Sequence, residues 1–364
     1  MTGRWYMEKL IRPDLARAGA YTPIRPLDVL SERSGVPLSE VIKLNGNENP
    51  YGCSPRVQRA LAAYGYYHIY PDPEQQELRL ALQKYVGVDA EHIVAGAGSD
   101  ELIDLILRLL LDPGDEVVSC PPTFGMYQFS TGVCAGKVID VPRGGGFAVD
   151  VAAVKRAVTP RTKAVFLASP NNPTGNIVPE GTVRELLRLG IAVIVDEAYY
   201  EFSGVTVVPL VAEHDNLMVL RTFSKWAGLA GLRVGYGIFQ PQLVAYLMKI
   251  KQPYNISSAA QVAALESLAD LDYLRGTVGA LVRERERLLS LLQRLDFLCP
   301  YPSQANFILC RVTNGRAKEI HQELQRRGIF LRYFDTPLLQ DCIRISVGRP
   351  EHTDALMRTL EEMG

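Results

Sequence analysis

The sequence has little excess of either charge and few of the short motifs that mark metal or hydrolase sites. Its 364 residues include 39 Lys and Arg against 40 Asp and Glu, so the formal net charge is −1. Such a balance supplies no basic face and argues against a nucleic-acid partner. The six cysteines form no C-x-x-C pair, the five histidines are scattered, and H-E-x-x-H and G-x-S-x-G are absent. We therefore expect no zinc ribbon, no disulfide framework and no histidine-based metal site.

Long apolar runs are also lacking. The longest nearly apolar run, residues 102–111, is interrupted by Asp104 and Arg108 and is too short to span a bilayer. The N-terminus carries no apolar signal core. We expect a cytoplasmic protein with no membrane partner, in which Cys120, Cys310 and Cys342 are buried, reduced thiols.

Two glycine-containing segments fall short of nucleotide-binding motifs. Gly96-Ala-Gly98-Ser-Asp-Glu101 lacks the third glycine of a dinucleotide fingerprint. The segment at 132–138 is one residue too short for a P-loop and has valine in place of Ser or Thr. Neither segment by itself supports a nucleotide-binding protein.

Alternating helical and apolar patterns predict an α/β fold. Helical spacing covers residues 74–86 and a stretch from residue 102 to 110, and helices are also expected at 151–158 and 183–189. The apolar runs between them are typical of strands buried on both faces, which form a mainly parallel sheet with helices on both sides. These predicted strands are residues 93–98, 116–120, 137–141, 163–168, 192–195, 218–221 and 234–239.

The chain divides into three predicted parts. Residues 1–44 are rich in proline and form an irregular arm, with a short helix near 10–18, that packs with the small domain. Residues 45–258 form the large domain, and residues 259–364 form a smaller α+β domain. The small domain begins with a nearly continuous helix over 259–295, whose charged run at 283–287 is interpreted as a solvated face. Its remaining elements are strands at 306–312, 329–333 and 342–347 and helices at 317–327 and 351–363.

Four polar segments lie at the ends of predicted strands. They are Ser169-Pro-Asn-Asn172-Pro-Thr-Gly175, Asp196-Glu-Ala-Tyr199, Arg221-Thr-Phe-Ser-Lys225 followed by Ala230-Gly-Leu-Arg233, and Ile343-Arg344-Ile-Ser. The carboxyl ends of parallel strands share one sheet edge, where ligands bind. Asn172, Asp196 and Lys225 should therefore converge. Each residue alone has a simpler explanation, such as a turn, a helix cap or a surface charge, and only the joint pattern points to one site.

These motifs resemble the fold-type-I, pyridoxal-phosphate-dependent aminotransferases of class I/II, and within them most closely the histidinol-phosphate aminotransferases. The resemblance runs from about residue 13 to 361 and also includes Lys43-Leu-Asn-Gly-Asn-Glu-Asn-Pro-Tyr51, Tyr70-Pro-Asp-Pro-Glu74 and Cys120-Pro-Pro-Thr-Phe-Gly-Met-Tyr127. It implies a large domain with a mainly parallel sheet, a smaller α+β domain and an N-terminal arm.

The resemblance implies roles around the pyridoxal phosphate ring. Lys225 corresponds to the Schiff-base lysine, which also moves the substrate proton, and burial with nearby cations such as Arg233 should lower its pKa. Asp196 would keep the ring nitrogen protonated. Asn172 and Tyr199 would donate to the ring oxygen, and Phe124 would stack on the ring where the subfamily often has tyrosine.

The phosphate group needs donors and positive charge. Gly98, Ser99 and Asp100 open a helix whose free N–H groups and dipole suit an anion, with the Asp100 side chain expected to cap the helix. Thr222, Ser224 and Arg233 would complete the residues of this chain that bind the phosphate. Tyr70 resembles a tyrosine that reaches the phosphate from the neighbouring subunit. The resemblance therefore implies a homodimer.

The resemblance also implies a substrate. Arg344 occupies the position of the arginine that holds a substrate carboxylate, or a phosphate in the histidinol-phosphate subfamily, and Arg332 supplies a second cation. Tyr21 would close over the substrate, and Asn47 is assigned to substrate binding. The expected reaction is ping-pong transamination of L-histidinol phosphate with 2-oxoglutarate.

Four alternatives stay open at this point. An aromatic amino-acid aminotransferase would use Arg344 for a carboxylate, and a threonine-phosphate decarboxylase would keep the same cofactor but release carbon dioxide. A nicotinamide dehydrogenase and a non-catalytic, cofactor-binding regulator belong to other classes. The incomplete glycine pattern disfavours the dehydrogenase, and an intact Lys225 disfavours the regulator.

Overall fold

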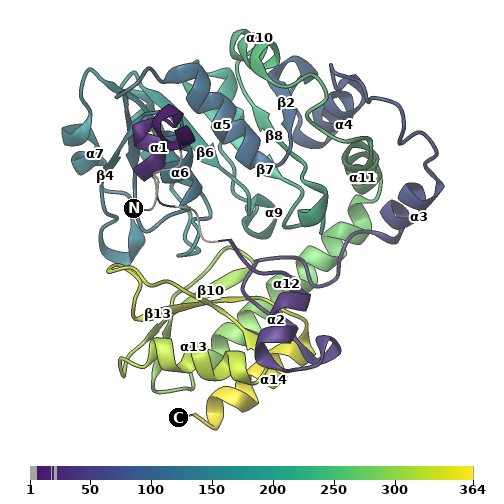
Figure 1. Cartoon of the computed structure of the whole chain (residues 1–364), viewed down its shortest axis with the longest axis vertical. Coiled ribbons are helices and arrows are strands. Elements are labelled where there is room, and N and C mark those ends of the chain that lie inside the picture. The colour runs from purple at the N-terminus through teal and green to yellow at the C-terminus, as the bar shows by residue number, and fades with distance from the viewer. Residues whose placement is uncertain (1–5, 18, 20–22, 364) are drawn as a thin grey trace.

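The computed structural model describes residues 6–17, 19 and 23–363. A large sheet with helices around it fills the upper part of Figure 1, and a smaller sheet with its own helices lies below. Among the described residues, no helix combines the length and the apolar character that a membrane span requires.

The large sheet has seven strands in the order β2-β8-β7-β6-β5-β3-β4. Only β8 runs antiparallel to its neighbours, so the predicted mainly parallel α/β sheet is confirmed. The predicted strand at 93–98 ends earlier, at Gly96, because the left-handed Gly98 (φ 80°) begins the turn into the next helix. The strands are β2 (Ile93–Gly96), β3 (Glu116–Ser119), β4 (Lys137–Asp140), β5 (Thr162–Ala168), β6 (Ala192–Asp196), β7 (Leu217–Thr222) and β8 (Gly235–Ile238).

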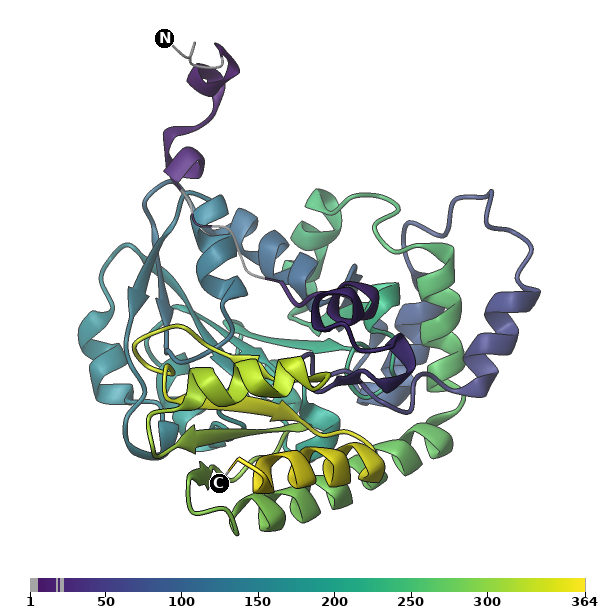
Figure 2. The same ribbon diagram turned by 60° about the horizontal axis from the view of Figure 1, so that its bottom comes forward.

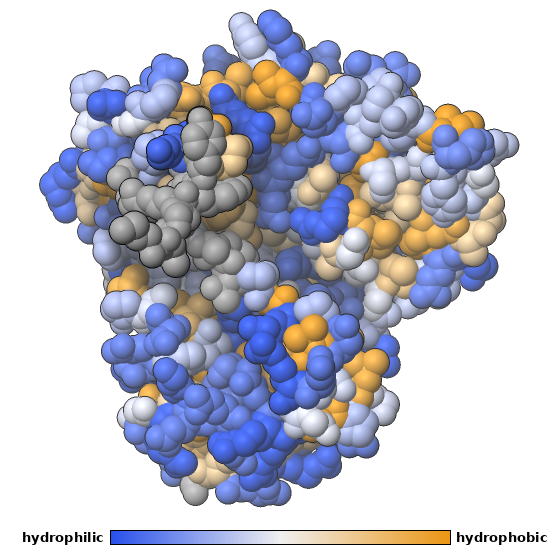
Figure 3. All heavy atoms as spheres, in the orientation of Figure 1, coloured by the Kyte–Doolittle hydropathy of each residue, from blue (hydrophilic) through white to orange (hydrophobic). Residues whose placement is uncertain are grey.

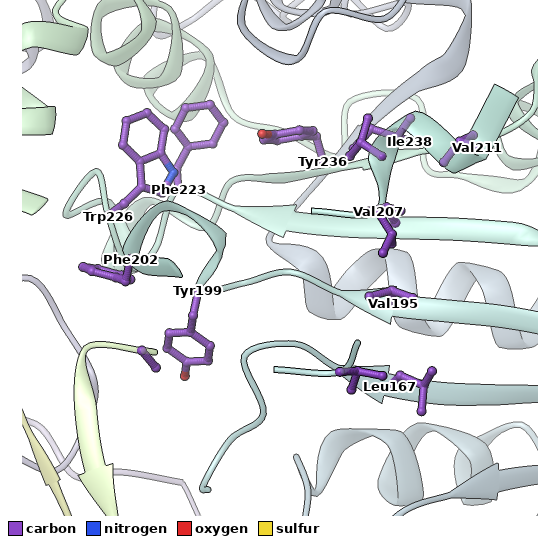
Figure 4. Close-up of a cluster of buried hydrophobic side chains, with 14 of the residues drawn as sticks. Leu167, Val195, Tyr199, Phe202, Val207, Val211, Phe223, Trp226, Tyr236 and Ile238 are labelled. Carbon is purple, nitrogen blue, oxygen red and sulfur yellow. The ribbon is translucent and has the colours of Figure 1, made fainter. Parts of the chain in front are cut away.

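Both faces of this sheet are buried along its central strands, as continuous apolar strands require, whereas the predicted burial is wrong for the edge strand β4, which has no buried residue. Along β6, Val193 and Val195 enter one hydrophobic cluster while Ile194 enters the other, which is the period-2 alternation of a strand. Figure 4 shows the first cluster, with Leu167 and Val195 on neighbouring strands. Helices α4 (Gln76–Val86), α8 (Glu180–Leu187) and α11 (Ser258–Leu268) cover that face, and α5 (Ser99–Leu110), α6 (Met126–Val133) and α10 (Pro241–Ile250) cover the other.

The smaller sheet is antiparallel, with strand order β12-β13-β10-β9. The predicted strand over 329–333 is wrong as a single element. Its first half, β11 (Ile329–Phe330), pairs in parallel with β1 (Ile42–Lys43), and its second half, β12 (Arg332–Tyr333), joins the antiparallel sheet. The remaining elements are β9 (Leu298–Pro300), β10 (Phe307–Val312), β13 (Cys342–Ser346), α12 (Leu271–Leu292), α13 (Ala317–Arg326) and α14 (Pro350–Glu361).

The nearly continuous helix predicted over 259–295 is in fact two helices, α11 and α12, separated at Ala269 and Asp270. The interpretation of the run at 283–287 as a solvated face is wrong for two members. Glu284 and Arg285 are each 6% exposed, and Arg285 donates from Nη1 to the Ala305 carbonyl (3.1 Å). Charge alone did not reveal which side of α12 packs inward.

The N-terminal residues contain more helix than the sequence predicts. The expected short helix near 10–18 is represented by α1 (Pro13–Arg17), which together with η1 (Tyr6–Leu10) projects from the body in Figure 2. An unpredicted helix, α2 (Leu27–Ser34), buries only Leu30 and so lacks a strong apolar pattern. The other helices are α3 (Pro55–Ala63), α7 (Val151–Ala157) and α9 (Tyr200–Ser203).

The packing of α11 bears on where one domain would end. Helix α11 lies against α3 and α4, and Ala260, Ala263 and Ala264 belong to the same hydrophobic cluster as the large sheet. Leu288 and Leu292, near the end of α12, belong to the cluster of the small sheet. We therefore propose a boundary within α12 in place of one between residues 258 and 259.

Candidate active site

A cavity of about 640 Å³ lies at the carboxyl edge of the large sheet, where the small sheet faces it. Its walls contain most of the residues that the sequence singled out. The predicted residues among those lining it are Asn47, Ser99, Asp100, Phe124, Asn172, Asp196, Tyr199, Thr222, Ser224, Lys225, Arg233, Arg332 and Arg344.

Lys225 follows the end of β7 and turns its amine into this cavity. Its Nζ donates to the Gly46 carbonyl (3.2 Å) and lies 5.9 Å from the centre of the Tyr199 ring. Burial is the main cause that lowers the pKa of Lys225 to about 8, and the Arg344 guanidinium lowers it further. Arg233, the cation expected from the sequence, acts in the same direction with a smaller effect. An amine with this pKa is available as a base near neutral pH.

Asp196 is the last residue of β6 and is 4% exposed. Its Oδ1 accepts from the Ala198 N–H (3.1 Å), and its Oδ2 accepts from the Tyr127 hydroxyl (2.7 Å). Desolvation raises the pKa of Asp196 to about 6, and the Tyr127 hydrogen bond opposes that rise. An ionised carboxylate offers about four acceptor sites, so one remains on each oxygen for a cationic group in the cavity.

Tyr127 is a site residue that the sequence analysis quoted without giving it a role. It lies on α6, and Phe124 lies two residues before the first residue of that helix. The two rings meet edge to face (5.6 Å, 87°). The other side of Tyr127 stacks on Phe166 of β5 (4.7 Å, 14°). The i,i+3 spacing after the predicted stacking residue is the signal that could have indicated it.

The anion end of the cavity is built by the start of α5 and by Arg233. Gly98 is the N-cap of α5 with φ 80°, a conformation that favours glycine, and a Cβ on it would lie 2.5 Å from Arg233 Nη2 and displace the guanidinium. A Cβ on Gly235 would likewise lie 2.7 Å from the Ser99 nitrogen. The first N–H groups of α5, the hydroxyls of Ser99, Thr222 and Ser224, and the guanidinium suit a phosphate.

The expectation that the Asp100 side chain caps α5 is wrong. The N-cap residue is Gly98, and the Asp100 carboxylate instead forms an ion pair with Arg233 (2.9 Å). This pairing removes the apparent charge conflict, because Asp100 fixes the guanidinium at the mouth of the anion site. Glu101 accepts a hydrogen bond from the Ala97 N–H instead (2.6 Å).

Arg332 and Arg344 stand opposite each other in the register of β12 and β13. Opposed residues of an antiparallel pair point to one face, so both guanidinium groups reach the cavity together. Arg344 is 4% exposed and donates from Nη1 to Asn172 Oδ1 and from Nη2 to the Asn45 carbonyl (2.7 Å). The small sheet is thereby tied to the loop after β5.

Asn47 was predicted to bind substrate, and its contacts are within the protein. Its Nδ2 donates to the Tyr199 hydroxyl (2.9 Å), and its Oδ1 accepts from Ser346 Oγ (2.8 Å). The backbone of Asn47 is left-handed (φ 53°) and its N–H also donates to Ser346 Oγ (2.9 Å). Asn47 therefore orients Tyr199, and because it also lines the cavity its contact with substrate stays a prediction.

Two further predicted residues remain, one that the structure places away from the cavity and one that it does not describe. Tyr70 is 77% exposed and does not line the cavity of its own chain. Tyr21 lies outside the described residues.

Residues 39–362 match the family model for aminotransferases of class I and II. The chain therefore belongs to the class I and II aminotransferases, as the sequence motifs indicated. The histidinol-phosphate aminotransferase of Roseiflexus castenholzii is 53% identical over 363 residues, covering 97% of this chain and 98% of that protein. The chloroplastic histidinol-phosphate aminotransferase of Nicotiana tabacum is 50% identical over 357 residues, which cover 97% of this chain and 86% of that protein.

A solved structure supports the same relation. The histidinol-phosphate aminotransferase from Sinorhizobium meliloti, crystallised in complex with pyridoxal-5′-phosphate, matches this chain with a TM-score of 0.87. The two are 27% identical, and the match covers 97% of this chain and 98% of that one. The resemblance drawn from the sequence is confirmed, and the nicotinamide dehydrogenase and the non-catalytic regulator are excluded.

Proposed function

We propose that this chain transaminates L-histidinol phosphate with 2-oxoglutarate, giving imidazole acetol phosphate and glutamate in histidine biosynthesis. Its relatives at 48–53% identity over nearly the whole chain are histidinol-phosphate aminotransferases. The observation that carries the proposal is the juxtaposition of Arg332 and Arg344 on one cavity wall. Two guanidinium groups suit a phosphate dianion, because each can donate a bidentate pair.

The residues present fit pyridoxal phosphate. Because Gly98 has no side chain, the N-terminus of α5 beside Arg233 is open to a phosphate. Each oxygen of Asp196 accepts one hydrogen bond and can accept another from a ring N–H. Phe124 lines the cavity with its ring, and Asn172 and Tyr199 line the same cavity as Lys225. When bound, the cofactor supplies a protonated ring that stabilises negative charge at the substrate α-carbon.

The chain's own residues then have distinct tasks. The Lys225 amine takes a proton from the substrate α-carbon, a task for which its lowered pKa suits it. The Asp196 carboxylate would pair with the ring nitrogen, and Arg233 with the α5 N-terminus would hold the cofactor phosphate. Arg344, already bonded to Asn172, positions the substrate anion between the two sheets. One cavity serves the amino donor and the 2-oxoglutarate acceptor in turn, which gives ping-pong kinetics.

A substrate panel on the purified holoenzyme tests this function. Histidinol phosphate, phenylalanine, tyrosine, aspartate and threonine phosphate are compared as amino donors with 2-oxoglutarate. We expect kcat/KM to be highest for histidinol phosphate. A preference for the aromatic amino acids, or release of carbon dioxide from threonine phosphate without a keto-acid product, would contradict the proposal.

We further propose a homodimer with shared active sites. Large apolar side chains are exposed on the segment between α3 and α4, among them Tyr66 (63%), Tyr67 (54%), Ile69 (53%) and Tyr70 (77%). Figure 3 shows apolar surface over the part of this face where α3, α11 and that segment lie. Exposed apolar patches of this kind mark interfaces. A second copy would cover the patch and bring Tyr70 to the neighbouring cavity.

The proposed location is the cytoplasm. Cys120, Cys310 and Cys342 are buried free thiols, as predicted. Burial raises the pKa of each, which keeps them protonated and unreactive. Buried unpaired thiols are typical of a reducing compartment.

A further inference from the structure

A buried lysine outside the cavity holds a short stretch of backbone in place. Lys251 follows the last residue of α10 and is 7% exposed. Its Nζ donates to three carbonyls, those of Pro73 (2.8 Å), Gln252 (3.3 Å) and Pro253 (3.3 Å). An ammonium group has three donors, so this arrangement uses all of them.

The backbone that it holds belongs to the segment carrying Tyr70. Gln75 fastens the other end of this segment, because its amide donates to the Ala95 carbonyl (3.1 Å) and accepts from the Ala95 N–H (3.1 Å). The same Gln75 amide nitrogen donates to Asn255 Oδ1 (2.8 Å). Residues 73–75 are thus fixed to β2 and to the loop after α10.

The fixed backbone presents two rings at the surface. The ring of Tyr70 stacks on that of Tyr254 with centres 4.4 Å apart and planes 18° apart. Tyr254 is 46% exposed and Tyr70 77%. Lys251 contacts the backbone on both sides of the stack, through Pro73 near Tyr70 and through Pro253 beside Tyr254. Together with the Gln75–Asn255 hydrogen bond, this contact holds the two loops at one spacing.

The charges around Lys251 favour its protonated form. Burial lowers the pKa of Lys251, and the carboxylates of Glu74, Glu101 and Asp72 oppose that change, while Arg79 adds to it. Surrounded by carbonyl dipoles and acids, the ammonium fits this place better than a neutral side chain of equal length.

We propose that Lys251 is a positioning residue that acts across the subunit interface, holding Tyr70 where it meets the phosphate in the partner's cavity. This inference rests on the proposed homodimer with shared active sites. It predicts that damage at Lys251 appears in the active site of the other subunit.

The first test compares Lys251→Met with Lys249→Met, which alters an exposed lysine on the same helix. The readout is the dissociation constant of pyridoxal phosphate from the apoprotein, with Tyr70→Phe as the reference. We expect both Lys251→Met and Tyr70→Phe to weaken binding roughly tenfold, the effect of one hydrogen bond to a charged group, and Lys249→Met to leave it unchanged. If Lys251→Met bound the cofactor as tightly as the wild type while Tyr70→Phe bound it more weakly, the inference would be overturned and the shared site would stand.

The second test uses co-expressed mixed dimers in which one chain carries Lys225→Ala, so that only its partner's site is active. Lys251→Met placed on the Lys225→Ala chain should weaken cofactor binding at the active site. The same substitution on the chain with intact Lys225 should leave that site unchanged. The reverse pattern would show a role within one chain and overturn the inference.

A further variant guards against a folding defect. Tyr254→Leu removes the ring stack, leaves the three carbonyl contacts of Lys251 in place and should show the same cross-subunit pattern. A monomeric protein, or full cofactor affinity in Tyr70→Phe, would overturn the shared site and this inference together.

Discussion

At the scale of single residues, burial sets the acid–base character of the site. Lys225 and Asp196 both line the cavity, and desolvation disfavours the charged form of each, which lowers one pKa and raises the other. The protein thereby holds two charges that its own folding disfavours. The lowered pKa makes the neutral amine of Lys225 available as a base, and the Asp196 carboxylate is stabilised when a cationic group enters beside it.

Replacing Lys225 with alanine should abolish the proton transfer and leave the fold intact. We expect kcat to fall by at least about a hundredfold, the usual contribution of a positioned base. The mass of the chain after borohydride treatment with cofactor should show no covalent adduct. Lys249→Ala is the matched control, and near-native turnover by Lys225→Ala would refute the assigned role.

Replacing Asp196 with asparagine should stabilise the apoprotein while weakening cofactor binding. The folded-state pKa of Asp196, about 6, lies above its unfolded value, so this group favours folding at low pH and loses that contribution as the pH rises through 6. At pH 7 the carboxylate costs as much as about 3 kcal/mol, which the amide avoids.

Denaturant unfolding of the apoprotein at pH 4 and pH 7 measures this effect as a difference between variant and wild type. The gain in the free energy of unfolding should be much smaller at pH 4 than at pH 7. The exposed Asp272→Asn serves as the control. An identical difference at both pH values would show that packing, and not ionisation, is the cause.

At the scale of elements, paired strands bring the substrate arginines together. β12 has only two residues, yet its pairing with β13 places Arg332 opposite Arg344. The sequence of residues 329–333 predicts one strand, whereas β11 and β12 belong to different sheets. A run of five residues does not show which strands its two halves will pair with.

Removing the Arg332 guanidinium should discriminate between substrates. In Arg332→Ala, KM for histidinol phosphate should rise at least about tenfold, because a charge-assisted pair to the phosphate is lost. KM for glutamate should change much less, since Arg344 still holds a carboxylate. Arg311→Ala, on the exposed side of β10 in the same sheet, provides the control. Equal losses for both substrates would contradict phosphate recognition.

At the scale of the whole molecule, the proposed dimer brings the exposed segment 64–75 of one subunit to the cavity of the other. A lysine in place of Ile69 puts a charge into the exposed apolar patch. We expect this variant to run as a 40.3 kDa monomer, with weakened cofactor affinity and unchanged circular dichroism. The control is Leu38→Lys, because Leu38 is about as exposed as Ile69 but lies outside the segment 64–75. This variant should remain dimeric. A dimeric Ile69→Lys protein with full affinity would contradict this interface.

Much of the architecture follows from local patterns. Each apolar run of the large sheet formed a strand within a few residues of its predicted bounds, because a segment buried on both faces has one way to satisfy its backbone and its side chains. The motifs at the ends of β5, β6 and β7 could be placed on one edge for the same reason, since parallel strands leave no alternative.

The remaining features depend on residues that are distant along the chain and meet only when the sheets pack. The Tyr127 bond to Asp196, the pairing of Asp100 with Arg233, the burial of Glu284 and the three carbonyls around Lys251 are such contacts. A polar side chain could form hydrogen bonds or ion pairs with many residues, and the hydrophobic pattern of the sequence does not identify which. Which one it meets is fixed by close packing of the surrounding core, a property that no single segment holds.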